Sequence, residues 1–449
     1  MRIDLFSFLI YTLVVFVGCL SILFIINWND EEYLSIPEYP DQPGKISKSD
    51  NMYYVIAGFN AAAGENIQDM GYKIIHAFEA FAVNQDETAF NVEDIKNASV
   101  LNFNGDESIL CKPYRDGLCL PKIKNNKTAL IELENQNQTL YERYRTLINY
   151  KRYQEGSYYI PTWSGIFNTH YLHLNLIGLE WKKGNKNRAI KMLQEAVNFT
   201  HLVYSESDLL INHLIGLALL QNTLMLQAEL LKECNSCDDL KEIATAIPQL
   251  TKNQICMKKQ FYSEIDYAKR LMANTRTYGA GYEEQNDKNL ALKIWHRYFG
   301  KKAATFNEYY RLMNNIFNVC DMPSYKVKEY ETKNSRALFY DFPWYRYLYN
   351  PAGKYILEFQ ENSNYNLYSY IYSAIELEGL IRLLKSQALI YRNNIVPSNI
   401  NDYLNQLPDH LKNPYTNNPF KYDKKAHLIY FTSGINSESE NNQLISIKL

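Results

Sequence analysis

The sequence lacks an excess of charge of either sign, and this absence bounds its partners. Its 47 lysine and arginine residues nearly balance 49 aspartate and glutamate residues, which gives a formal net charge of −2. A chain this close to neutrality has no global field that would draw it to nucleic acid or to anionic lipid. We therefore expect no nucleic-acid partner.

The sequence also lacks the short motifs that mark common catalytic and nucleotide sites. Strand-like residues 51–56, the loop 57–64 and a helix beginning near Glu65 follow the order of a phosphate cradle, but neither GxGxxG nor GxxxxGK(S/T) is present. HExxH and GxSxG are absent as well. We therefore assign no catalytic, cofactor-binding or metal-binding residue, and we expect no cofactor.

The chain does contain a long uncharged apolar run, from Leu5 to Trp28. As a helix rising about 1.5 Å per residue, this run would span about 36 Å, enough to cross a hydrocarbon core of roughly 30 Å. The apolar core of a signal peptide is usually shorter, about 7–15 residues. We predict a membrane anchor over residues 1–28 and an extended linker over 29–50.

The charges that flank this run predict its orientation. Arg2 precedes it, whereas Asp30, Glu31 and Glu32 follow it. The positive-inside tendency then places the N-terminus in the cytoplasm and the remainder outside. Two alternatives stay open: a cleaved signal, and a lipoprotein, because the residues 16–19 (FVGC) approach a lipobox in which Cys19 would be cleaved and acylated.

Six cysteines follow the apolar run, and an even number outside the cytoplasm suggests disulfides. Cys111 and Cys119 bracket an Arg-Asp-Gly turn, so a small local loop is their natural pairing. Cys256 and Cys320 are paired by default.

The other two cysteines, Cys234 and Cys237, form a CxxC pair. A thioredoxin-like site would need a βαβ setting, and a four-cysteine zinc site would need a second CxxC. Neither is present, so we favour a structural bridge, or bonds to cysteines elsewhere.

The hydrophobic periodicity predicts a mainly α-helical protein. After the helix near Glu65, helices are expected over 128–151, 165–183, 187–203, 206–232, 238–246, 257–275, 286–315, 366–392 and 399–406. Strand composition at Phe420–Asp423 and Leu428–Phe431 predicts a small C-terminal β-hairpin. The expected domains are a helical ectodomain with a disulfide-bonded loop (51–320), a C-terminal helical segment with the hairpin (321–432) and a loose tail (433–449).

One helical hairpin has the spacing of a tetratricopeptide repeat whose turn is shortened by one residue. The residues that carry it are Gly178, Trp181, Gly184, Ala189, Leu193 and Ala196. Only one such copy is present, so we expect an antiparallel helical bundle or irregular array rather than a solenoid.

Two polar constellations remain as chemical candidates. His170 and His173 share a helix face, with His201 or His213 as a third metal ligand, but surface or core-edge histidines are the preferred interpretation. Acidic residues after Gly279-Ala280-Gly281 suggest a catalytic loop; they are Glu283, Glu284 and Asp287. Acidic residues are also common in the first turn of a helix, and we prefer this interpretation of the three residues.

Several segments together resemble an uncharacterised group of membrane-anchored, exported, mostly helical proteobacterial proteins. They are AGFNAAAGE, ILCKPYRDGLCLPK, YERYRTLINYKRY, NPAGKYI and LP…NPYTNNPFKYD. This last segment is also similar to the end of type II secretion pseudopilins, but the pseudopilin cleavage site is absent. The resemblance implies a single-pass protein of the bacterial inner membrane with a periplasmic ectodomain, and it implies no activity.

We therefore expect a non-enzymatic ectodomain that binds or scaffolds another envelope protein. An envelope hydrolase, with carboxylates that converge only in the folded chain, is the alternative. A redox module that uses Cys234 and Cys237 is a third hypothesis.

Overall fold

The computed structural model of the chain describes residues 5–36, 46–84, 100–234, 236–274, 300–338, 348–351, 353–354, 357, 367–434 and 444–449. The described part is mainly helical and has a small antiparallel sheet near its C-terminal end, which confirms the predicted fold class at this level. Its contacts define two units. Unit 1 joins Met1–Pro40 to Phe261–Tyr368, and unit 2 joins Asp41–Gln260 to Ser369–Leu449.

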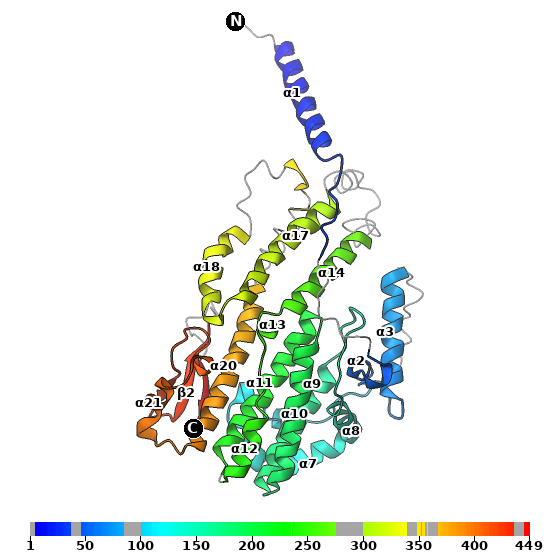
Figure 1. Cartoon of the computed structure of the whole chain (residues 1–449). Helices are drawn as coiled ribbons and strands as arrows, with labels where there is room; N and C mark the ends of the chain where they lie inside the picture. Colours follow the sequence, from blue (N-terminus) through cyan, green and yellow to red (C-terminus); the bar gives the residue numbers. More distant parts are fainter. Residues whose placement is uncertain are drawn as a thin grey trace. The chain divides into compact units, whose positions relative to one another are not determined.

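Unit 1 contains α1 (Leu5–Ile26), most of α14 (Lys258–Asn274), α17 (Lys302–Phe317) and α18 (Val327–Leu338) (Figure 1). Residues 30–36, which follow α1, form neither helix nor strand, but they are not a free linker. The Asp30 carboxylate accepts the backbone N–H groups of Ala303 (3.0 Å) and Ala304 (3.1 Å). These donors belong to the first turn of α17, whose backbone N–H groups lack partners within the helix.

A buried asparagine completes this end of α17. Asn350 has a positive φ of 51°, a conformation that asparagine tolerates better than most residues. Its side chain accepts the Lys301 N–H at 2.9 Å and donates to the Thr305 hydroxyl at 2.9 Å. A Cβ on Gly353 would lie 1.9 Å from that hydroxyl, which explains the glycine of the NPAG sequence.

Unit 2 is built on three long helices, α9 (Ser164–Lys182), α10 (Lys186–Glu206) and α11 (Leu210–Lys232). Helix α10 packs against both of the others (Figure 1). At the crossing of α10 and α11, a Cβ on Gly216 would lie 2.6 Å from the backbone nitrogen of Tyr204. The predicted helices over 165–183, 187–203 and 206–232 are confirmed within a few residues.

Shorter helices surround these three, and their bounds are as follows: α2 (Met52–Ala57), α3 (Ile67–Asn84), α5 (Pro113–Asp116), α6 (Leu120–Asn125), α7 (Lys127–Gln136), α8 (Gln138–Leu147), α12 (Cys237–Thr245), α13 (Lys252–Ile255) and α21 (Ile400–Asn405). The single helix predicted over 128–151 is two helices, because the buried Asn137 side chain bonds both the N–H and the C=O of Asn104.

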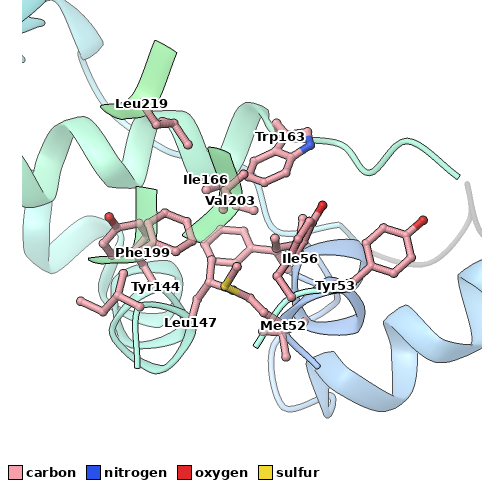
Figure 2. Close-up of a cluster of buried hydrophobic side chains, with 14 of the residues drawn as sticks. Met52, Tyr53, Ile56, Tyr144, Leu147, Trp163, Ile166, Phe199, Val203 and Leu219 are labelled. Carbon is pink, nitrogen blue, oxygen red and sulfur yellow. The ribbon is translucent and has the colours of Figure 1, made fainter. Parts of the chain in front are cut away.

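The strand predicted over residues 51–56 is wrong: these residues form α2 and its N-cap. Asn51 accepts the Tyr53 N–H at 3.1 Å and so starts a helix, and Met52, Tyr53 and Ile56 enter the core (Figure 2). A short apolar run fits a buried helix as well as a strand, so periodicity alone could not decide.

The C-terminal part of unit 2 combines α20 (Leu367–Arg392) with a sheet of three strands in the order β1-β2-β3. Strands β1 (Lys421–Asp423) and β2 (Leu428–Thr432) are the predicted hairpin. Strand β3 (Leu444–Lys448) lies in the tail that we predicted to be loose; Ile445 and Ile447 are buried, and they hold it in the sheet.

Candidate functional site

A cleft on the described surface of unit 2 is the candidate binding site. It has a volume of about 320 Å³. Its wall is formed by the disulfide loop, α11 and the sheet, and the lining residues are Tyr114, Arg115, Asp116, Gly117, Leu118, Met225, Ala228, Glu229, Lys232, Leu428, Leu444, Ile445, Ser446, Ile447 and Lys448. This volume is at the low end of ligand pockets, which measure about 300–1,000 Å³.

The first wall is the loop closed by the Cys111–Cys119 disulfide, as predicted, with the two Cα atoms 5.5 Å apart. Inside the loop, α5 ends at Gly117, whose φ of 79° favours glycine. The Arg-Asp-Gly letters therefore form the turn that the sequence predicted. The disulfide limits the conformations of this wall whether or not a ligand is present.

Polar side chains of the long helices fix the loop in place. Asn175 of α9 accepts the Cys111 N–H (3.0 Å) and donates to the Cys111 C=O (2.9 Å). Glu229 of α11 accepts the N–H groups of Cys119 (2.8 Å) and Leu120 (2.9 Å) and so caps α6. Burial raises the pKa of Glu229, and these two donors oppose the rise.

Lysines give the other end of the cleft a positive charge. Burial, and then the nearby Lys448, lower the pKa of Lys232. Among the described residues, neither lysine has a carboxylate within ion-pair distance. The other cleft charges are occupied: Asp116 binds Arg115 at 2.8 Å and Lys122 at 3.6 Å, and Glu229 caps α6.

Among the described residues, the remaining histidine candidates do not form a metal site. Each histidine of the HYLH pair bonds its own tyrosine: His170 bonds Tyr144 at 2.6 Å, and His173 bonds Tyr141 at 3.1 Å. Burial lowers the pKa of each of these two histidines to about 3. Over the described ranges, no group of three or more His, Cys, Asp or Glu side chains could hold a metal ion. His170 and His173 are therefore core histidines.

The two third-ligand candidates differ in burial, and His201 is only partly buried. His213 is fully buried, with its ring centroid 4.2 Å from that of Tyr204, and His201 lies on α10. The acidic candidates Glu283, Glu284 and Asp287, with Gly279–Gly281, lie outside the described residues.

The CxxC prediction needs a correction. Cys234 and Cys237 are free thiols, whereas Cys256 and Cys320 are each disulfide-bonded. Ser236 caps α12 through its bond from the Asp239 N–H (3.1 Å), which leaves Cys237 exposed at the start of the helix. Burial, and then Asp239, raise the pKa of the Cys234 thiol to about 11. Such a thiol is a poor nucleophile at neutral pH, which weakens the redox hypothesis.

The loop 57–64, whose position suggested a phosphate cradle, is hydrogen-bonded by a side chain of the protein. The guanidinium of Arg143 donates to the C=O groups of Phe59 (2.8 Å), Ala61 (2.6 Å) and Ala62 (2.7 Å). Arg143 thus binds the loop carbonyls, and the loop is a structural turn of the core.

The cleft was missed by sequence reasoning. Its strand wall lies in the predicted tail, where alternation at Ile445 and Ile447 was the available signal. The chain matches no protein-family model, and it has no significant match among curated proteins or among solved structures.

Proposed function

We propose that this chain is a membrane-attached, non-enzymatic protein whose unit 2 binds another envelope protein in the cleft. The observation that carries the proposal is the composition of the cleft: a strand edge on one side and a disulfide-fixed loop on the other. The exposed fraction is 50% for Leu444 and 45% for Leu118, although both side chains are large and apolar. Apolar side chains beside a polar rim are typical of protein-binding surfaces.

The hydrogen bonds of the buried polar groups support a binding role rather than the alternative, a hydrolase. Glu229 caps a helix, and His170 and His173 bond tyrosines inside the core. Glu376 and Ser433 are the pair that most resembles part of a hydrolase site, because Glu376 accepts a hydrogen bond from the Ser433 hydroxyl. Both residues are more than nine-tenths buried, so neither is open to a substrate.

We further propose that α1 is the retained anchor and that both units lie outside the cytoplasm, in the periplasm of a bacterium. Large apolar residues of α1 are exposed, among them Val14, Phe16 and Val17. The disulfides favour an oxidising compartment. The α9–α11 array fits the expected antiparallel helical hairpins.

By length and composition alone, a helix other than α1 is also a candidate for the membrane span. Among the described helices, α11 is long and apolar enough to span a membrane, but 78% of its apolar window is buried in the fold. It is therefore a core helix. The apolar part of α1 whose side chains are described, Tyr11–Ile26, is shorter.

Site-specific photocrosslinking in intact cells tests the binding role. A photoreactive residue is placed at Leu444 in the cleft and, as the matched control, at Val396, an exposed apolar residue away from it. We expect a discrete crosslinked product from position 444, reduced by Lys448→Glu, and none from position 396. Equal products from both positions, or no product from position 444, would overturn the proposal.

A further inference from the structure

The register of the sheet shows which backbone groups of β3 face outward. Leu428 pairs with Lys448, and the Leu449 N–H donates to the His427 C=O at 2.8 Å. This geometry makes Leu428–Lys448 a pair without mutual backbone hydrogen bonds. By alternation, the N–H and C=O groups of Leu444, Ser446 and Lys448 point away from β2, because β3 is an edge strand.

This outer edge faces the cleft. Residues from both faces of β3 line the cleft: the buried Ile445 and Ile447, and the less buried Leu444, Ser446 and Lys448. This is expected where a cleft lies against the edge of a strand rather than against one face of the sheet. At the Lys448 end, the Gln387 amide donates to the Lys448 C=O (3.2 Å) and to the Ala228 C=O of α11 (3.0 Å), so the protein itself bridges this end of the edge. Among the described residues, the outward backbone groups of Leu444 and Ser446 have no hydrogen-bond partner, so the edge is open over these residues. An open strand edge is a template for another strand.

We propose that the cleft binds an extended peptide segment of the partner protein, added as a fourth strand along β3, with a carboxylate between Lys232 and Lys448. This inference rests on the proposed function and names the chemistry of the partner. Strand addition supplies affinity through main-chain hydrogen bonds, and pockets for alternate side chains supply specificity.

The positive charges of Lys232 and Lys448 favour a carboxylate on the bound segment. Lys232 and Lys448 both line the cleft, and neither forms an ion pair among the described residues. Burial, and then Lys448, lower the pKa of Lys232, whereas Glu229 and Glu233 oppose this shift. A carboxylate that reaches both ammonium groups would give each of them an ion pair. The cleft carboxylates are already bound, Asp116 by Arg115 and Glu229 by the start of α6. An acidic segment therefore fits this end, whereas a basic one would add a third cation.

Apolar contacts select the alternate side chains. Leu118 of the disulfide loop and Leu444 of β3 are half-exposed on the two sides of the cleft. An added strand would place every second side chain toward the loop. Because Leu444 and Lys448 are four positions apart on β3, we expect an apolar residue four positions from the acidic one.

The test uses the full-length chain in lipid nanodiscs, against which a library of short random phage-displayed peptides is selected. Enriched peptides are then synthesised, and their affinities are measured by fluorescence anisotropy. We expect an acidic residue and an apolar residue four positions apart. Each peptide is made with a free C-terminus and with a C-terminal amide, which separates a side-chain carboxylate from a terminal one.

Paired variants of β3 identify the mode of binding. Ser446→Pro removes an outward N–H that β2 does not use, and proline is tolerated on strand edges. Ser446→Ala keeps that N–H and is the matched control. We expect Ser446→Pro to weaken binding by about tenfold or more, and Lys448→Glu by a similar factor, while Ser446→Ala changes it less than about twofold.

Several outcomes would overturn the inference. Ser446→Pro and Ser446→Ala proteins that bind equally would exclude strand addition, and enriched peptides without acidic residues would exclude the charge argument. If no peptide is enriched while the crosslink from position 444 still forms, the partner binds through a folded surface. In that case the proposed function stands and this inference fails.

Discussion

Buried polar side chains of unit 2 accept hydrogen bonds from backbone N–H groups at helix starts, which have no partner within the helix. Glu155 is the clearest case. Its carboxylate accepts the N–H groups of Asp208 (2.8 Å) and Leu209 (2.5 Å) and the side-chain amide of Asn212 (2.7 Å), at the start of α11. Burial nevertheless raises the pKa of Glu155 to about 7, so the charged carboxylate is held at a cost.

This residue makes stability depend on pH in a predictable direction. Between pH 4.5, the ordinary pKa, and about pH 7, the folded chain binds more protons at Glu155 than the unfolded chain does. Stability from this group is therefore full below the ordinary pKa and falls by about 3 kcal/mol as the pH rises to 7. In urea unfolding of the full chain in detergent, Glu155→Gln should flatten the profile over this interval; parallel profiles would contradict the assignment.

The thiols give a second prediction at this scale. Cys237 is exposed, whereas burial raises the pKa of Cys234 to about 11. Alkylation at pH 8 should label Cys237 at least about tenfold faster than Cys234. Cys111, Cys119, Cys256 and Cys320 should react only after reduction, as mapped by mass spectrometry. Protection of Cys234 and Cys237 until reduction would instead show the bridge that the sequence suggested.

At the scale of elements, close helix crossings define unit 2. The backbones of α10 and α11 approach at Gly216, where a Cβ would lie 2.6 Å from the Tyr204 nitrogen and 2.8 Å from its Cα. The obstacle is backbone, so a side-chain rotation cannot relieve it.

Gly216→Ala should therefore destabilise the protein by about 2 kcal/mol or more, because the two helices must separate. Gly156→Ala is the control, since the nearest atom to its Cβ, the Tyr54 hydroxyl oxygen, lies at 4.0 Å. Thermal unfolding followed by circular dichroism measures both. Equal midpoints for the two variants would show that this crossing is looser than described.

The elements also show where sequence patterns suffice. The long helices α9, α10, α11 and α20 were predicted within a few residues, because each repeats its apolar pattern over several turns. Two short elements were missed: α2 was predicted as a strand, and β3 as a loose tail. So few residues carry too few repeats for the period alone to decide, whereas the turn between β1 and β2 supplied a second signal for the hairpin.

At the scale of the whole molecule, membrane attachment through α1 can be tested directly. Val14 and Val17 are exposed on α1. Replacing both by arginine adds about 2.5–3.5 kcal/mol per residue to the cost of insertion near the centre of a membrane helix. We expect this double variant to leave the carbonate-resistant membrane fraction.

Val396→Arg is the matched control, since Val396 is an exposed valine of unit 2. It should stay with the membranes, as we expect of the unmodified chain. Retention of the α1 double variant in the carbonate-resistant fraction would mean that α1 is not the anchor.

The sequence by itself determined the helical class, the long helices, the hairpin of β1 and β2, and the disulfide loop at Cys111 and Cys119. These features depend on local pattern, spacing and turn chemistry, which are readable along the chain. Tertiary structure decided that Asp30 caps α17, that Glu229 caps α6 and that β3 borders a cleft. Each of these joins residues far apart in sequence, and local periodicity holds no information about such pairs.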